Sequence, residues 1–236
     1  MNNVDVPART TEFDWLLAID TSTEQIGLAL TDGERMIELS LPGGRQQTTS
    51  MLPLIDWLIS KQELSIADIQ VVAVAIGPGS FTGLRVGLSI AKGLALAQDA
   101  KVVGIPTLDI VAWSYRQSRI PLIAVIPAGR SRFVWSLVDA AGKSVPPVNG
   151  SLDELVSGST TNRDHLVVGE LPFSVHSTLV EQGAWIESHG LGNRRNAALA
   201  AFGWSRYSLG DVDDPALLEP IYLHGKQTAL PPRSQR

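Results

Sequence analysis

The sequence predicts an α/β protein of two duplicated lobes, each with a mixed sheet flanked by helices. Short β-branched runs alternate with longer segments of helical periodicity, as where Val71–Ile76 is followed by the helical pattern at 82–98. The order of hairpin, third strand, helix, strand and helix occurs twice along the chain, more faintly the second time. A length of 236 residues with 44% hydrophobic residues suits a globular protein with room for both lobes.

The first lobe is predicted at residues 15–118, after a flexible tail at 1–14. Asp32-Gly33 is a strong hairpin signal between its second and third strands. Pro53 is tolerable only in the first turn of its helix, because proline has no N–H to donate. The expected strands are 15–20, 25–31, 35–41, 70–76 and 101–105, and the expected helices are about 49–60, 82–98 and 107–118.

The second lobe is predicted at residues 119–223, before a flexible tail at 224–236. Its hairpin turns at 127–130, and a second glycine turn follows at 140–143. The expected strands are 121–126, 132–139, 165–169 and 184–187, and the expected helices are 152–156, 173–181 and 193–207.

Composition and charge narrow the classes of function. A net charge of −5 argues against a protein that binds nucleic acid through a broad basic surface. The chain has no cysteine, so disulfides, thiolate catalysis and cysteine metal sites are excluded, and a cytoplasmic location is expected. No apolar window of about 20 residues exists to span a bilayer. The histidines lack the spacing of a helical metal site, so no metal of its own is expected.

A strand, a glycine turn and a helix start meet at residues 71–87. Asp20, Gly77, Gly79 and Gly83 are therefore the candidate residues for a nucleotide or anion loop, since backbone N–H groups gather at such a turn. The alternative is that the glycines only let the helix fold tightly onto its sheet. Asp20 in turn can hold the N–H groups of the turn that follows it. A second carboxylate is missing from the later hairpin, where Pro127 stands, so a magnesium site is not favoured.

Three stretches resemble one protein family. The run 17–23 (Leu-Ala-Ile-Asp-Thr-Ser-Thr), the run 77–87 (Gly-Pro-Gly-Ser-Phe-Thr-Gly-Leu-Arg-Val-Gly) and the run 91–95 (Ala-Lys-Gly-Leu-Ala) are similar to the TsaB (YeaZ) family. The ending 219–223 (Glu-Pro-Ile-Tyr-Leu) looks like its C-terminal signature. Two places depart from the family pattern, which has histidine where Gln47 aligns and Asp-Ala-Arg where Pro127-Ala128-Gly129 aligns.

The resemblance implies an actin-like ATPase fold (ASKHA, ribonuclease H-like) and a role in making threonylcarbamoyladenosine at position 37 of tRNA. It implies a non-catalytic subunit that binds the catalytic paralogue TsaD and is joined by the ATPase TsaE, with ATP and metal held by these partners. It further implies self-association when the chain is alone, and only indirect contact with tRNA. An actin-fold phosphotransferase or nucleotide hydrolase using Asp20 and the loop 77–83 is the alternative, and a homodimer with an unrelated binding role is a third interpretation.

The two helices of the first lobe are the predicted partner-binding face. A small-residue stripe on the helix at 82–98 and an apolar face on the helix at 49–60 leave one flank to be covered. Glycines inside a helix cost about 1 kcal/mol each, which close approach of another backbone would offset. The alternative is that both helices pack wholly inside their own lobe. The predicted face consists of Met51, Leu54, Ile55, Leu58, Gly83, Leu84, Gly87, Leu88, Ala91, Leu94 and Ala95.

Overall fold

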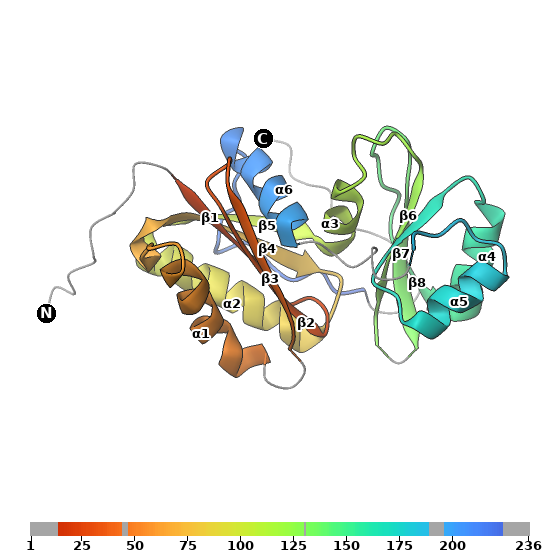
Figure 1. The fold of residues 1–236 in the computed structure, drawn as a ribbon, viewed down its shortest axis with the longest axis horizontal. Helices are drawn as coiled ribbons and strands as arrows, with labels where there is room; N and C mark the ends of the chain where they lie inside the picture. The colour runs from red at the N-terminus through yellow and green to blue at the C-terminus, as the bar shows by residue number, and fades with distance from the viewer. Residues whose placement is uncertain (1–13, 44–46, 130, 189–195, 224–236) are drawn as a thin grey trace, which may run out of the picture. The chain divides into compact units, whose positions relative to one another are not determined.

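A computed structural model describes residues 14–43, 47–129, 131–188 and 196–223, which form two units (Figure 1). Of the described residues, the first unit contains 14–43, 47–76, 81–105 and 196–220. The second contains 77–80, 106–129, 131–188 and 221–223. The predicted tails lie outside the described residues, apart from Asp14.

The first unit holds a five-stranded mixed sheet. Its strands lie in the order β3-β2-β1-β4-β5; β1 is antiparallel to β2 and parallel to β4, and β2 is antiparallel to β3. The central strands are apolar on both faces and almost wholly buried, as expected for a sheet covered on both sides. The bounds are β1 Trp15–Asp20, β2 Gln25–Thr31, β3 Met36–Pro42, β4 Ile69–Gly77 and β5 Lys101–Pro106.

Three helices cover this sheet. The helices α1 (Gln47–Ser60) and α2 (Phe81–Gln98) lie on one face, and α6 (Asn196–Ser208) lies on the other (Figure 1). Because α1 begins at Gln47, Pro53 stands in its second turn, so the expectation of a first-turn proline was wrong. The side chain of Gln47 is not among those described.

The second unit repeats the topology of the first with a four-stranded sheet. The order is β8-β7-β6-β9, with β6 antiparallel to β7 and parallel to β9. The third strand, β8, was not predicted, and the strand expected at 184–187 makes only an isolated parallel bridge between Ile186 and Val167. The bounds are β6 Leu122–Pro127, β7 Arg132–Val138, β8 Val148–Ser151 and β9 Leu166–Gly169.

The helices of the second unit are α3 (Thr107–Trp113), α4 (Leu152–Thr161) and α5 (Phe173–Glu181). Helix α3 ends five residues before the expected Ser118. Helix α4 begins at the expected Leu152, where Ser151 and Glu154 form a capping box, and it continues to Thr161, beyond the expected end at Val156. Within the described ranges, no helix is both long enough and apolar enough to cross a membrane.

The two units exchange their last helices, which corrects the predicted boundary between 118 and 119. Helix α3 follows β5 in the chain but packs on β6, β7 and β9, where Leu108 and Val111 join a cluster around Ala124. Helix α6 follows the elements of the second unit but packs on β1, β2 and β3 of the first. Gly203 allows this contact, because a Cβ there would lie 2.5 Å from the Cβ of Ala73.

Candidate functional site

Asp20 ends β1 and is buried, with 2% of its surface exposed. Its Oδ1 accepts hydrogen bonds from the backbone N–H of Ser22 at 2.9 Å and from the Ser22 hydroxyl at 2.7 Å. A short carboxylate that binds the chain two residues further on closes an Asx turn. The turn-holding interpretation of Asp20 is therefore confirmed, and this oxygen serves the β1–β2 connection.

The glycines at the start of α2 receive the β1–β2 turn. The Thr21 hydroxyl donates to the carbonyl oxygen of Gly83 at 2.7 Å. A Cβ added at Gly87 would lie 2.5 Å from Thr21 Oγ1, a contact that real Cβ atoms do not make. What approaches this glycine is thus a threonine side chain of the same unit, and not the backbone of another helix as expected.

The predicted nucleotide loop is divided by the fold. Asp20 and Gly83 belong to the first unit, whereas Gly77 and Gly79 belong to the second. Gly77 has φ of 106°, a backbone conformation that favours glycine. Gly77 therefore has a conformational role at the end of β4, and whether the loop also binds an anion stays a prediction.

The second hairpin contributes no carboxylate at its turn. The Ala128 N–H donates to the Arg132 carbonyl, and the Arg132 N–H donates to the Gly129 carbonyl. The two described histidines are engaged elsewhere, with His165 Nδ1 at 2.9 Å from Asp164 Oδ1 and His176 Nε2 at 2.9 Å from a backbone oxygen. Among the residues whose placement is described, no three histidine or acidic side chains are grouped as a metal site would require.

Most of the predicted partner-binding residues lie in the core of the first unit, so the predicted face is corrected. The buried small residues and leucines of α2 face the sheet, because Gly87 brings the helix close to β1. Leu54 and Leu94 are half-buried against the same core. The residues that are buried, and so not exposed to a partner, are Met51, Ile55, Leu58, Gly83, Leu84, Gly87, Leu88, Ala91 and Ala95.

The opposite side of these two neighbouring helices still exposes large apolar side chains. On α1, Leu52 is 58% exposed and Trp57 is 49% exposed. On α2, Phe81 is 50% exposed and Leu96 is 90% exposed. Helices α1 and α2 lie side by side on the sheet (Figure 1). These four side chains define what we call the outer apolar face, and their apolar character on the polar side of each helix was the signal that sequence reasoning missed.

Two further features shape the outer apolar face. The guanidinium of Arg85 lies 3.8 Å from the ring centroid of Phe81, a cation–π contact that orders both exposed side chains. Gly93 is exposed, and a Cβ added there would meet nothing within 4 Å. Close packing within the chain therefore does not explain Gly93, whereas it does explain Gly87.

Comparison with known proteins places this geometry in context. Residues 42–157 match the family model described as TsaD: tRNA N6-adenosine threonylcarbamoyltransferase. The chain is 35% identical over 125 residues to the tRNA threonylcarbamoyladenosine biosynthesis protein TsaB of Escherichia coli strain K12, covering 51% of this chain and 53% of that protein. It is 39% identical over 97 residues to the protein of the same name from Haemophilus influenzae, covering 41% of each. The chain thus spans about half the length of the curated relatives that it matches.

The solved structures extend the likeness to the whole fold. YeaZ from Pseudomonas aeruginosa superposes with a TM-score of 0.70 and 21% sequence identity, covering 89% of this chain and 100% of that chain. The predicted actin-like α/β fold with duplicated mixed sheets is confirmed.

Proposed function

We propose that this chain, which belongs to the TsaB (YeaZ) family, serves tRNA threonylcarbamoyladenosine biosynthesis as a non-catalytic subunit. It binds a TsaD-like paralogue, with a TsaE-like ATPase as a further partner of the pair. The chain holds no nucleotide or metal of its own, and these cofactors reside in the partner subunits.

The observation that carries this proposal is the outer apolar face. Its four side chains stay exposed although α1 and α2 already pack fully onto their own sheet. The four residues are spread along the two helices, with Phe81 at the first residue of α2 and Leu96 near its last. Large apolar side chains that stay exposed on adjacent elements are typical of a protein–protein interface. We therefore assign partner binding to the outer apolar face and not to the buried residues that were first expected to contact the partner. Both sets of residues belong to the same two helices, α1 and α2.

The geometry of Asp20 supports the non-catalytic part of the proposal. Its Oδ1 is committed to Ser22 within the β1–β2 turn through two hydrogen bonds. Thr21, the next residue, is used to hold α2. The sequence run that resembles the family is thereby accounted for by packing.

Co-purification with TsaD tests the docking surface. We expect Trp57→Glu and Phe81→Glu each to weaken binding by tenfold or more, because aromatic residues at the centre of interfaces carry much of the binding free energy. Gly93→Arg should also block binding, since a long side chain would stand where the partner approaches. The matched control is Leu209→Glu, because Leu209 is 83% exposed on the same unit but lies outside the face. Unchanged TsaD binding by the three face variants, with folding intact, would contradict the proposal.

Two measurements test the functional class. Expression of the chain should restore the modification in cells that lack their own TsaB, and the face variants should fail to restore it. Isothermal titration of the purified chain with Mg-ATP should show no tight binding. Tight binding that Asp20→Ala abolishes would favour the phosphotransferase or hydrolase alternative instead.

A further inference from the structure

One end of the sheet in the second unit gathers basic side chains from separate loops. Leu122 begins β6 and pairs with Val138 at the end of β7 and with Leu166 at the start of β9. The segments before β6, after β7 and before β9 therefore meet at the same end. They carry Arg116 and Arg119, then Lys143, then Arg163, and all four are exposed.

The acidic side chains of these segments are engaged locally. Asp139 Oδ1 accepts the backbone N–H groups of Ala141 and Lys143 at 2.9 and 2.8 Å. Asp164 lies 2.9 Å from His165 Nδ1, and this hydrogen bond lowers the pKa of Asp164. Neither acid is paired with a described arginine or lysine at this end, but hydrogen bonding leaves a carboxylate charged, and the lowered pKa of Asp164 favours its charged form. A third acid, Glu187, accepts a hydrogen bond from Tyr115, next to Arg116. The four exposed cations therefore outnumber these three acids by one.

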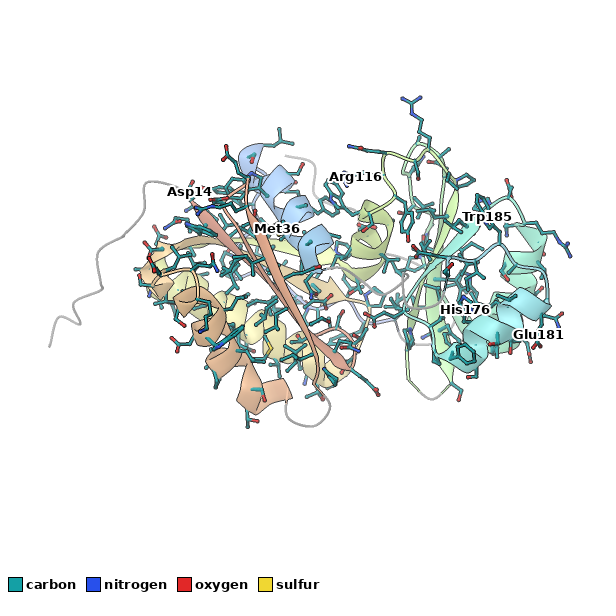
Figure 2. The ribbon with its side chains drawn as sticks, in the orientation of Figure 1. Asp14, Met36, Arg116, His176, Glu181 and Trp185 are labelled. Carbon is teal, nitrogen blue, oxygen red and sulfur yellow. The ribbon has the colours of Figure 1, made fainter. Side chains whose placement is uncertain are left out.

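The basic side chains are largely available to a ligand. Arg119 and Lys143 form no ion pair with any residue within the described ranges. The guanidinium of Arg116, which is labelled in Figure 2, lies 4.2 Å from the ring centroid of Trp113. The same group donates to the Trp113 carbonyl oxygen at 2.9 Å. One face of the guanidinium is therefore ordered against an aromatic ring while the side chain remains exposed.

This arrangement has the chemistry of an RNA contact. Exposed cations attract phosphates, and an ordered guanidinium plane can stack on an unpaired base. Interleaving of aromatic and basic residues occurs at 113–119, which reads Trp-Ser-Tyr-Arg-Gln-Ser-Arg. An acidic protein surface could pair with the edge of the same guanidinium through carboxylates, so the test below includes an acidic polymer as a competitor.

We propose that this end of the second unit, defined by Arg116, Arg119 and Lys143 with Trp113, binds RNA directly. The choice of tRNA as the natural ligand rests on the proposed function. Direct binding of tRNA differs from the sequence-based expectation that this chain contacts tRNA only indirectly. The negative net charge of the whole chain does not argue against such a local site. Net charge sums over the entire surface, whereas a phosphate strand responds to charges within about 10 Å at ordinary ionic strength.

Fluorescence anisotropy with the full chain and labelled unmodified tRNA tests the site. We expect Arg116→Glu with Arg119→Glu to weaken binding at least tenfold at about 0.1 M salt. The slope of log affinity against log salt should fall by roughly 0.7 to 0.9 for each phosphate that the variant no longer neutralises. The matched control is Lys61→Glu with Lys101→Glu, because Lys61 also lies over a tryptophan ring, that of Trp57, at 5.9 Å. The control should change affinity less than twofold.

Two further experiments distinguish specific binding of RNA from non-specific attraction of any anion. Arg116→Lys keeps the charge but removes the planar group, so it should retain the salt slope and still bind more weakly. Polyglutamate should compete poorly with tRNA at equal charge. Equal competition, or equal weakening in the control variant, would overturn the proposal. Lys143→Glu, on an exposed turn, gives a second test if the double variant does not fold.

The result is independent of the test for TsaD binding. A chain that fails to bind tRNA but co-purifies with TsaD contradicts only this inference. A chain that binds tRNA through Arg116 and Arg119 but ignores TsaD contradicts only the proposed function.

Discussion

In the first unit the sheet ends beyond β4 in a full strand, β5. In the second unit the corresponding place beyond β9 is taken by residues 184–187, which make only one bridge to β9. Each unit fastens this edge through a polar side chain at the end of the exchanged helix. In the first, Arg206 of α6 donates to the Gly104 carbonyl at 2.9 Å. In the second, the Tyr115 hydroxyl, just after α3, donates to the carboxylate of Glu187. The two units thus make this contact at corresponding positions but with different chemistry.

The two contacts differ in their charge. Arg206 is buried and also holds Asp211, at 2.6 and 2.8 Å, while Asp213 accepts the Gly104 N–H at 2.7 Å. Burial acts to lower the pKa of Arg206, but the hydrogen bonds and charges of Asp211 and Asp213 outweigh it and raise the pKa. The tyrosine contact is a single hydroxyl on a half-buried residue. In the first unit, the complete edge strand β5 is therefore held by a network of charged side chains. In the second unit, the segment 184–187, with its single bridge, is held by one hydrogen bond.

The largest expected effect comes from separating α6 from the first sheet. Gly203→Leu should lower the free energy of unfolding by about 3 kcal/mol or more, because its Cβ would lie 2.5 Å from Ala73 on a central strand. Urea unfolding followed by circular dichroism measures the change. Gly93→Leu makes the same exchange in open space and should not destabilise the chain, because leucine also favours a helix more than glycine does. Equal effects of the two variants would mean that α6 does not hold the first unit together.

A paired substitution compares the two edge contacts directly. Arg206→Ala should cost about 2 to 3 kcal/mol, because it leaves the carbonyl of Gly104 without its donor and removes the cation that Asp211 and Asp213 share. Tyr115→Phe should cost about 1 kcal/mol, the usual value for one hydrogen bond. Hydrogen exchange at β5 and at 184–187 would localise each effect. An equal or larger cost for Tyr115→Phe would reverse the ranking of the two edges.

Substituting alanine for two glycines of α2 should change the free energy of unfolding in opposite directions. Gly87→Ala should destabilise by about 1 kcal/mol net, since the clash with Thr21 outweighs the better helix propensity of alanine. Gly93→Ala should stabilise by up to about 1 kcal/mol, because nothing opposes the new methyl group. Thermal unfolding of the two variants tests this pair. Stabilisation by both would show that the Thr21 contact is not tight.

The smallest expected effect concerns the β2–β3 turn of the first unit. Burial acts to raise the pKa of Asp32, but the backbone and side chain of Arg35 and the N–H of Glu34 outweigh it, so the pKa lies below its ordinary value. A lowered pKa adds stability above the unfolded value of about 4, and this stability disappears as pH falls through the folded value. Asp32→Ala should therefore cost at most about 1 kcal/mol at pH 7, because the turn is solvated.

The pH dependence separates this contribution from packing. The stability difference between Asp32→Ala and the parent chain should start to shrink as pH falls below about 4, where the carboxyl of the unfolded chain becomes protonated, and should disappear as pH falls through the lower pKa of the folded chain. Unfolding measured from pH 7 to pH 3 gives the difference. A difference that stays constant over this range would assign the effect to side-chain packing.

The comparison of the two units also shows what local sequence signals could predict. The strands of the first unit were predicted closely because β-branched runs and turn residues are local signals, as at Asp32-Gly33. The turn-holding role of Asp20 was visible for the same reason. In the second unit, β8 was missed because Val148–Ser151 is four residues long and contains asparagine and glycine, which are poor strand formers.

Long-range choices were beyond local signals. Periodicity identifies the apolar face of a helix but not the sheet that this face covers, so α3 and α6 were assigned to the wrong lobes. The small residues Gly83 and Gly87 correctly predicted that another group packs closely against α2. The identity of that group was predicted wrongly, because the missing side chain of a glycine makes room equally for Thr21 and for a partner helix. The basic end of the second unit was invisible in the net charge, since it forms only when the register brings separate loops together.

The exchange of α3 and α6 has a consequence for dividing the chain. The half of the sequence that ends at Ser118 contains α3, which packs on β6, β7 and β9, whereas the sheet of that half is covered by α6 from the other half. A fragment that stops at Ser118 would therefore leave the α6 side of its own sheet exposed to water. The two halves of the sequence are not independent folding units, because each contributes the helix that the sheet of the other half needs.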